Sequence, residues 1–240
     1  MLKRFLIIGV LLSCFSFYVK RQKNPPGTVK IFEHFFADET EISNFSWLEF
    51  EYDIKRRYGV FSKEHLAVIP DTTVWLTYEA GDVFVKNYYR SVAYRDYPVV
   101  GISHEQARLF CEWRNFRVKQ YYSVVYKKEL KINYRLPKEV EWEFLNVPPF
   151  SLEHKEPSKL VKDSAKFPTL TLPVYSRYPN LLKIYNLIGN VAEMVEEKGI
   201  SKGGSFAHSA DESLPGKQQL YQGAQAWLGF RCVCEYTVNM

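Results

Sequence analysis

The chain has 240 residues, of which 46% are hydrophobic, 16% aromatic and 25% charged, so it can form one domain with a substantial core and is not disordered by composition. Its formal net charge of +5 equals the five basic residues of positions 1–23, all of which precede the first acidic residue, Glu33. Residues 24–240 therefore sum to zero. We expect no nucleic-acid partner, because the folded part carries no excess of positive charge.

The N-terminus has the pattern of an export signal. Lys3 and Arg4 precede the apolar run 5–12, and the following Leu-Ser-Cys sequence, which ends at Cys14, resembles a bacterial lipobox. A membrane span is a competing interpretation, but the apolar stretch 5–19 is shorter than the roughly 17–25 residues that cross a bilayer. Ordinary signal cleavage is another, although it leaves Cys14 without a role.

We therefore predict a signal peptide with lipobox over residues 1–14, a tether over 15–27 and one domain over 28–240. Lipidation of Cys14 would make the chain an exported lipoprotein, anchored in a membrane and facing the periplasm. The outer membrane is the favoured location.

The first half of the domain predicts a helix and then a strand. Asn44 is a suitable N-cap for a helix through Tyr58, and Gly59 is suited to end it. Residues 68–78 are rich in β-forming residues but contain a proline and an aspartate, so we expect a loop that enters a strand.

A second helix is expected to start at Ser103, which forms a capping-box pattern with Gln106, and to end near Asn115. Residues 121–126 and 131–134 then predict two strands of a hairpin.

A third helix is expected after Pro137, with Val140 and Phe144 on its buried face. Residues 146–180 and the glycine-punctuated C-terminal third predict irregular structure. The expected class is α+β with many loops.

Six segments, in chain order, resemble the signature segments of one family, the formylglycine-generating enzymes or sulfatase-modifying factors. They are residues 36–44 (FADETEISN), 97–113 (YPVVGISHEQARLFCEW), 134–144 (YRLPKEVEWEF), 186–194 (NLIGNVAEM), 202–206 (KGGSF) and 229–232 (GFRC). The resemblance implies a C-type-lectin-like α+β fold that is rich in loops.

A finer resemblance lies within that family. Residues 70–75, 88–90 and 93–98 are similar to segments of the gliding-motility lipoproteins K and J, which belong to the machinery of gliding and type IX secretion. Residues 116–133 are similar to an insert that these lipoproteins carry. The resemblance implies partners among envelope proteins, including gliding or type IX secretion components, and a lipid-anchored contact with the membrane.

The family's enzymes oxidise a cysteine of a sulfatase to formylglycine with a copper ion, held by two cysteines between the "GGS" and "GFR" segments. Thiolates suit Cu(I), because both are soft, but residues 206–231 of this chain contain no cysteine. We therefore expect no copper, no catalytic residues and a non-catalytic binding or scaffold role. The alternatives are an enzyme of the family with altered chemistry and a carbohydrate-binding module.

The resemblance also implies a disulfide between Cys111 and Cys232, which occupy the positions of the family's helix cysteine and the cysteine after "GFR". An exported chain would keep such a bond. Cys234 would then be a spare, buried thiol. We expect Cys232 and Cys234 to point to opposite faces of a strand, and so not to rebuild a copper site.

Some family members bind calcium at the segment that matches residues 186–194. Carried over, the ligands would be the side chains of Asn186 and Glu193 and the carbonyl groups of Gly189 and Val191, oxygen donors that suit a hard cation. The alternative is that both side chains form hydrogen bonds within the protein.

The remaining candidates predict structural roles. Glu139 and Glu143 are four residues apart on a helix, and we expect them on a solvated face. Arg135 and Arg231 match family positions and are expected to hold buried ion pairs. The five histidines show no metal-ligand spacing.

Overall fold

The computed structural model describes residues 24–79, 81–127, 130–146 and 170–238. Cys14, the predicted signal peptide and most of the predicted tether lie outside these residues. Within the described part, no helix is both long and apolar enough to cross a membrane.

The elements, in chain order, begin with two strands and a run of helices; one strand and one helix then precede the C-terminal strands. They are β1 (Thr28–Phe32), β2 (Phe35–Asp38), α1 (Asn44–Tyr58), α2 (Lys63–Leu66), the 3-10 helix η1 (Thr72–Thr77), α3 (Gly81–Asn87), η2 (Val92–Tyr94), α4 (His104–Tyr126), β3 (Leu130–Arg135), α5 (Glu139–Asn146), β4 (Ala192–Met194), β5 (Ile200–Lys202), β6 (Gln219–Leu220), β7 (Leu228–Gly229) and β8 (Val233–Val238). This composition confirms the α+β class.

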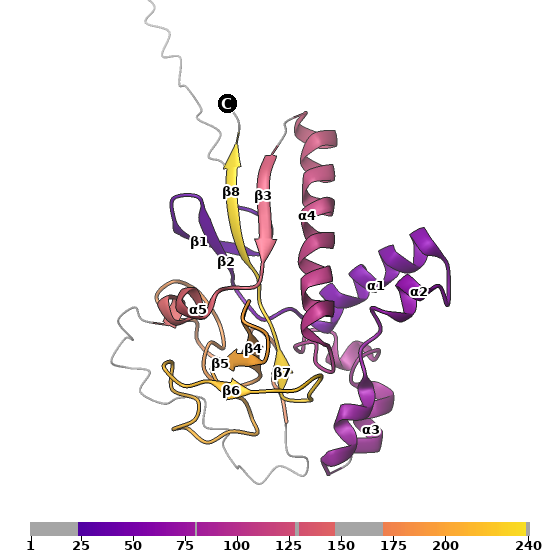
Figure 1. The fold of residues 1–240 in the computed structure, drawn as a ribbon, viewed down its shortest axis with the longest axis vertical. Coiled ribbons are helices and arrows are strands. Elements are labelled where there is room, and N and C mark those ends of the chain that lie inside the picture. The colour runs from indigo at the N-terminus through magenta and orange to yellow at the C-terminus, as the bar shows by residue number, and fades with distance from the viewer. Residues whose placement is uncertain (1–23, 80, 128–129, 147–169, 239–240) are drawn as a thin grey trace, which may run out of the picture.

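Two four-stranded sheets organise the chain. The first has the order β1-β2-β8-β3 with antiparallel neighbours, and α4 runs along β3 (Figure 1). The second has the order β6-β5-β4-β7, in which β4 and β7 are parallel. Since β8 lies between β2 and β3, the C-terminal strand joins the N-terminal hairpin to the middle of the chain.

Helix α1 has the predicted bounds but a different cap. The hydroxyl of Ser43, rather than the side chain of Asn44, accepts a hydrogen bond from the backbone N–H of Ser46 at 3.2 Å. Asn44 is buried, and its amide donates to the carbonyls of Tyr88 and Tyr94. Gly59 follows the helix with φ of 96°, a conformation that favours glycine.

Helix α4 confirms the predicted capping box of Ser103 and Gln106, but its expected end near Asn115 is wrong. The helix continues to Tyr126, so the predicted strand over 121–126 does not form, and only β3 of the expected hairpin exists. The reason is the spacing of Cys111, Val118 and Tyr122, which places these three side chains on one helical face against the core.

Two further expectations are corrected. The loop expected at the start of residues 68–78 is followed by η1 instead of a strand, because Asp71 accepts a hydrogen bond from the N–H of Thr73 and starts a helical turn. In α5, Val140 and Phe144 are 69% and 46% exposed, and the buried face carries Trp142 and Leu145 instead. The helix therefore packs through the side opposite to the predicted one.

The core also corrects the expectation for Cys232 and Cys234. Both thiols lie in the main core cluster with Cys111, whereas Val233 packs in a second cluster on the other side. Residues two apart in a strand share a face, so the two cysteines point the same way.

Candidate functional site

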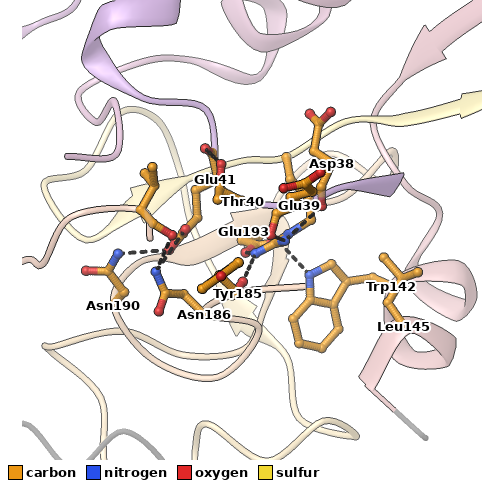
Figure 2. A network of polar contacts seen from close by, with 12 residues as sticks. Asp38, Glu39, Thr40, Glu41, Trp142, Leu145, Tyr185, Asn186, Asn190 and Glu193 are labelled. Atoms are coloured by element: carbon orange, nitrogen blue, oxygen red, sulfur yellow. Dashed lines mark hydrogen bonds and ion pairs between the residues drawn. The ribbon is translucent and has the colours of Figure 1, made fainter. Parts of the chain in front are cut away.

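A network of buried polar side chains joins the end of β2 to the C-terminal loops (Figure 2). At its centre, the fully buried guanidinium of Arg231 donates to both carboxylate oxygens of Glu193, at 2.6 and 2.7 Å. Glu193 also accepts from the indole N–H of Trp142 at 2.8 Å. Arg231 therefore holds the buried ion pair that the sequence predicted.

The same guanidinium fastens two distant segments. It donates to the backbone carbonyls of Asp38 and Glu39, at 3.2 and 3.4 Å, and to the carbonyl of Tyr185 at 2.7 Å. A single side chain thus links the end of β2 and the residue that follows it to the loop around Tyr185, in which the N–H of Tyr185 donates in turn to the carbonyl of Glu39.

A second buried ion pair and a third carboxylate complete the network. Asp38 pairs with Arg114 at 2.8 Å and accepts from the backbone N–H of Cys232 at 2.8 Å. Glu41, which is 1% exposed, accepts from the amides of Asn190 and Asn186, at 2.8 and 3.2 Å.

The charges of this network leave Glu41 without a cation of its own. Arg114 and Arg231 neutralise Asp38 and Glu193, while Glu41 contacts only amides. Burial therefore raises the pKa of Glu41 from an ordinary value of 4.5 to about 8, with Arg231 lowering it and Glu193 raising it further. Burial thus favours the protonated form of Glu41.

We expect Glu41→Gln to remove a pH dependence of stability. Because the folded pKa lies above the unfolded one, the native state holds a proton that the unfolded chain has released, and stability falls as pH rises between the two values. Between pH 6 and 7.5, the free energy of unfolding should fall by about 2 kcal/mol more in the unsubstituted chain than in the variant. Urea unfolding at both pH values measures this, and equal slopes would contradict it.

The predicted calcium ligands do not form an open cation site. The carboxylate of Glu193 is occupied by Arg231 and Trp142, and the amide nitrogen of Asn186 faces Glu41. The oxygen of Asn186 accepts from Ser176 at 3.2 Å. No group of three or more His, Cys, Asp or Glu side chains is arranged around a metal position in the part of the chain that the structure describes.

Gly189 and Val191, the two residues predicted to bind calcium through their carbonyl groups, lie in the same loop as Asn186. Gly189 has φ of 83° and donates its N–H to the carbonyl of Gly203, and Val191 is buried. The side chains fit hydrogen bonding within the protein better than a cation, and calcium binding stays a prediction.

The expectation that Glu139 and Glu143 face solvent is wrong. Both carboxylates bind the ammonium group of Lys202, at 3.0 and 2.7 Å, and the Lys202 side chain is fully buried. The sequence analysis assigned no role to Lys202, although this residue directly precedes the "GGS" segment. The other predicted arginine, Arg135, pairs with Glu141 at 2.6 Å in a partly exposed position.

The three described cysteines are buried thiols. The sulfurs of Cys111 and Cys232 lie 3.4 Å apart, so the pair implied by the resemblance is adjacent, while its disulfide stays a prediction. Burial raises the pKa of Cys232 well above its ordinary range, and that of Cys234 to about 12. Reactive thiolates are therefore not favoured at either position.

A tight turn precedes residues 206–231, the segment that corresponds to the one in which the family's enzymes hold their cysteine pair. Gly203 and Gly204 have φ of 85° and 62°, and a Cβ atom at Gly204 would lie 2.0 Å from the hydroxyl of Ser213. This turn places the hydroxyl of Ser205 2.7 Å from Nδ1 of His208. The ring of His208 packs edge-on against Trp227.

A surface depression of about 370 Å³ adjoins this turn. It is lined by His208, Asp211, Glu212, Lys217, Gln218, Gln219 and Leu220. Burial lowers the pKa of His208 while Glu212 opposes that shift, so the imidazole is neutral at pH 7. The arrangement offers a neutral imidazole and mixed charges, a set of groups suited to hydrogen bonding and proton transfer.

Three solved structures align with the chain, and the first of them, that of CarF, agrees with this architecture. The structure of CarF aligns with a TM-score of 0.53 at 18% sequence identity, over 83% of this chain and 85% of that one. Treponema denticola variable protein 1 aligns with a TM-score of 0.49 at 17% identity, over 84% of each chain. PvdO from Pseudomonas aeruginosa aligns with a TM-score of 0.44 at 21% identity, over 59% of this chain and 63% of that one.

No curated protein matches the chain. The family profile of the sulfatase-modifying factor enzyme 1-like domain matches residues 10–147, which is more than half of the sequence. The chain therefore belongs to the family of sulfatase-modifying factor enzyme 1-like domains.

Proposed function

We propose that this chain is a non-catalytic binding or scaffold module of the bacterial envelope. The observation that carries this proposal is the absence of cysteine from residues 206–231, where the family's copper enzymes hold their metal. Near the start of that segment stand a hydroxyl and an imidazole, those of Ser205 and His208. Neither can supply a bis-thiolate site for Cu(I).

A conversion assay tests the proposal. The full chain is incubated with copper and a cysteine-containing sulfatase peptide, and the aldehyde product is trapped and counted by mass spectrometry. We expect no conversion, with a formylglycine-generating enzyme as the positive control in the same buffer. Conversion above the copper-only background would overturn the non-catalytic assignment.

For the partner, we propose components of gliding motility or type IX secretion, reached from a lipid anchor at Cys14 in the outer membrane. The segments that resemble lipoproteins K and J contribute Trp75, Tyr88, Tyr94 and Tyr97 to one aromatic cluster with ring centroids 4.6–6.3 Å apart. Trp75 and Tyr88 are buried, so the cluster packs these segments together and places them in one region of the molecule.

Crosslinking in the native envelope, followed by mass spectrometry, tests this partner. Recovery of gliding or type IX secretion components is expected, and high salt should extract Cys14→Ser from the membrane fraction but not the lipid-anchored chain. Recovery of only lipid and abundant porins would contradict it.

A second candidate is an enzyme with altered chemistry. It is favoured by the contact of Ser205 with His208 beside the 370 Å³ depression. However, Ser205 is only 4% exposed and also accepts the N–H of Ala207, as expected of a serine that closes a turn. Labelling of Ser205 by a serine-directed fluorophosphonate, absent in Ser205→Ala, would support this candidate.

A further inference from the structure

The turn that joins α1 to α2 projects from the side of the molecule away from both sheets (Figure 1). We call residues 55–63 the α1–α2 tip. Seven consecutive residues of the tip, from Lys55 to Phe61, are exposed. They include large apolar side chains, with Val60 at 55% and Phe61 at 78% exposure.

The tip is held in place by a buried polar cluster. Phe61 has φ of 63°, unusual for a bulky residue, and its backbone N–H donates to Nδ1 of His65 at 3.3 Å. His65 must then carry its proton on Nε2, which lies 3.3 Å from a carboxylate oxygen of Glu51. Glu51 also accepts from Tyr89 and from Arg90. The aromatic ring of Phe61 is therefore exposed by a defined local structure.

The tip is also basic. Lys55, Arg56, Arg57 and Lys63 lie in it, and no acidic residue does. The nearest acid before the tip, Asp53, is buried and pairs with both arginines, at 2.9 and 2.6 Å. Lys55 and Lys63 have no acidic partner among the described residues. The exposed Glu64 follows the tip and offsets one of these charges, while the two arginines share the single carboxylate of Asp53, so the tip and its acidic neighbours keep a net positive charge.

We propose that the α1–α2 tip binds the headgroup layer of an anionic membrane. Phe61 and Tyr58 would enter the interface, where aromatic side chains are favoured, and Lys55 and Lys63 would contact lipid phosphates. A protein partner fits less well, because a stable interface needs about 800 Å² on each side, more than one short turn presents. Nucleic acid would need an extended basic face, which the neutral domain lacks.

This contact can be measured at the tip itself, which separates it from any binding by the predicted N-terminal anchor. The full chain carries Cys14→Ser and either Val60→Cys or Val92→Cys, each labelled with an environment-sensitive nitrobenzoxadiazole dye. Val92 is a matched control, since it is also an exposed valine, at 79%, and lies beside the start of α1 rather than its end. The remaining cysteines, Cys111, Cys232 and Cys234, are buried and should not react in the folded protein.

With vesicles of phosphatidylethanolamine and phosphatidylglycerol, we expect a several-fold increase and a blue shift of dye emission at position 60, and neither at position 92. Phosphatidylcholine vesicles should give no response. The additional pair Lys55→Glu and Lys63→Glu should abolish the signal while the far-ultraviolet circular dichroism stays unchanged. An unchanged emission at position 60 with anionic vesicles, or an equal response at position 92, would overturn the membrane contact, whether or not the domain is catalytic.

Discussion

Arg231→Met should lower the free energy of unfolding by about 3–5 kcal/mol, because it leaves the buried carboxylate of Glu193 without its cation. The indole of Trp142 would remain as the only described donor to Glu193. The carbonyls of Asp38 and Tyr185 would also lose the donor that Arg231 supplies, while that of Glu39 would keep the backbone N–H of Tyr185. Urea unfolding followed by tryptophan fluorescence measures the loss.

Arg135→Met is the matched control. Arg135 also bonds two carboxylates, those of Glu141 and Glu235, but its side chain and both partners are partly exposed. We expect a loss of about 1 kcal/mol or less. The double variant Arg231→Met and Glu193→Met should recover part of the stability, since it removes both buried charges. Equal losses in Arg231→Met and Arg135→Met would show that burial of the Arg231–Glu193 pair does not increase its contribution to the free energy of unfolding.

Local signals in the sequence predicted local structure well. The capping box of Ser103 and the end of α1 at Gly59 each depend on a few neighbouring residues, and both are confirmed. The motif order predicted the family, which the profile over residues 10–147 confirms. These features share one property, namely that short segments determine them.

The wrong expectations concern packing between distant parts. Residues 116–126 contain β-branched and aromatic residues that resemble a strand, but their contact with β3 and the core keeps them helical. The face of α5 could not be chosen without knowing that Trp142 reaches Glu193, 51 residues away. Likewise, only the fold shows that Glu139 and Glu143 enclose the buried ammonium of Lys202.

The candidate site was only partly predictable for the same reason. Asn186, Glu193 and Arg231 were identified from motifs, but their partners were not, because the bonds from Asn186 and Asn190 to Glu41 span 145 and 149 residues of sequence. In the structure the side chains of Asn186 and Glu193 form amide contacts and an ion pair, and calcium binding at this loop stays a prediction. The sequence could not show which charged side chains are buried together. Their number and pairing decide the protonation state of Glu41.

The final prediction concerns the thiols of the core. Once oxidised, Cys111 and Cys232 should form a disulfide that closes a loop of about 120 residues, and reduction should lower the free energy of unfolding by about 4–5 kcal/mol in the chain-entropy model. The two sulfurs already lie 3.4 Å apart on α4 and beside β8, so little backbone movement is needed. Urea unfolding with and without reductant measures the difference.

Cys234 supplies the matched control, because its thiol is buried in the same cluster and points the same way as that of Cys232. Cys234→Ala should keep the full difference between oxidised and reduced protein, whereas Cys111→Ala should abolish it. Loss of the difference in both Cys111→Ala and Cys234→Ala would identify Cys234 as the partner of Cys111 and overturn the pairing implied by the family. If oxidised and reduced protein are equally stable in the unsubstituted chain and in both variants, packing alone holds α4 against β8.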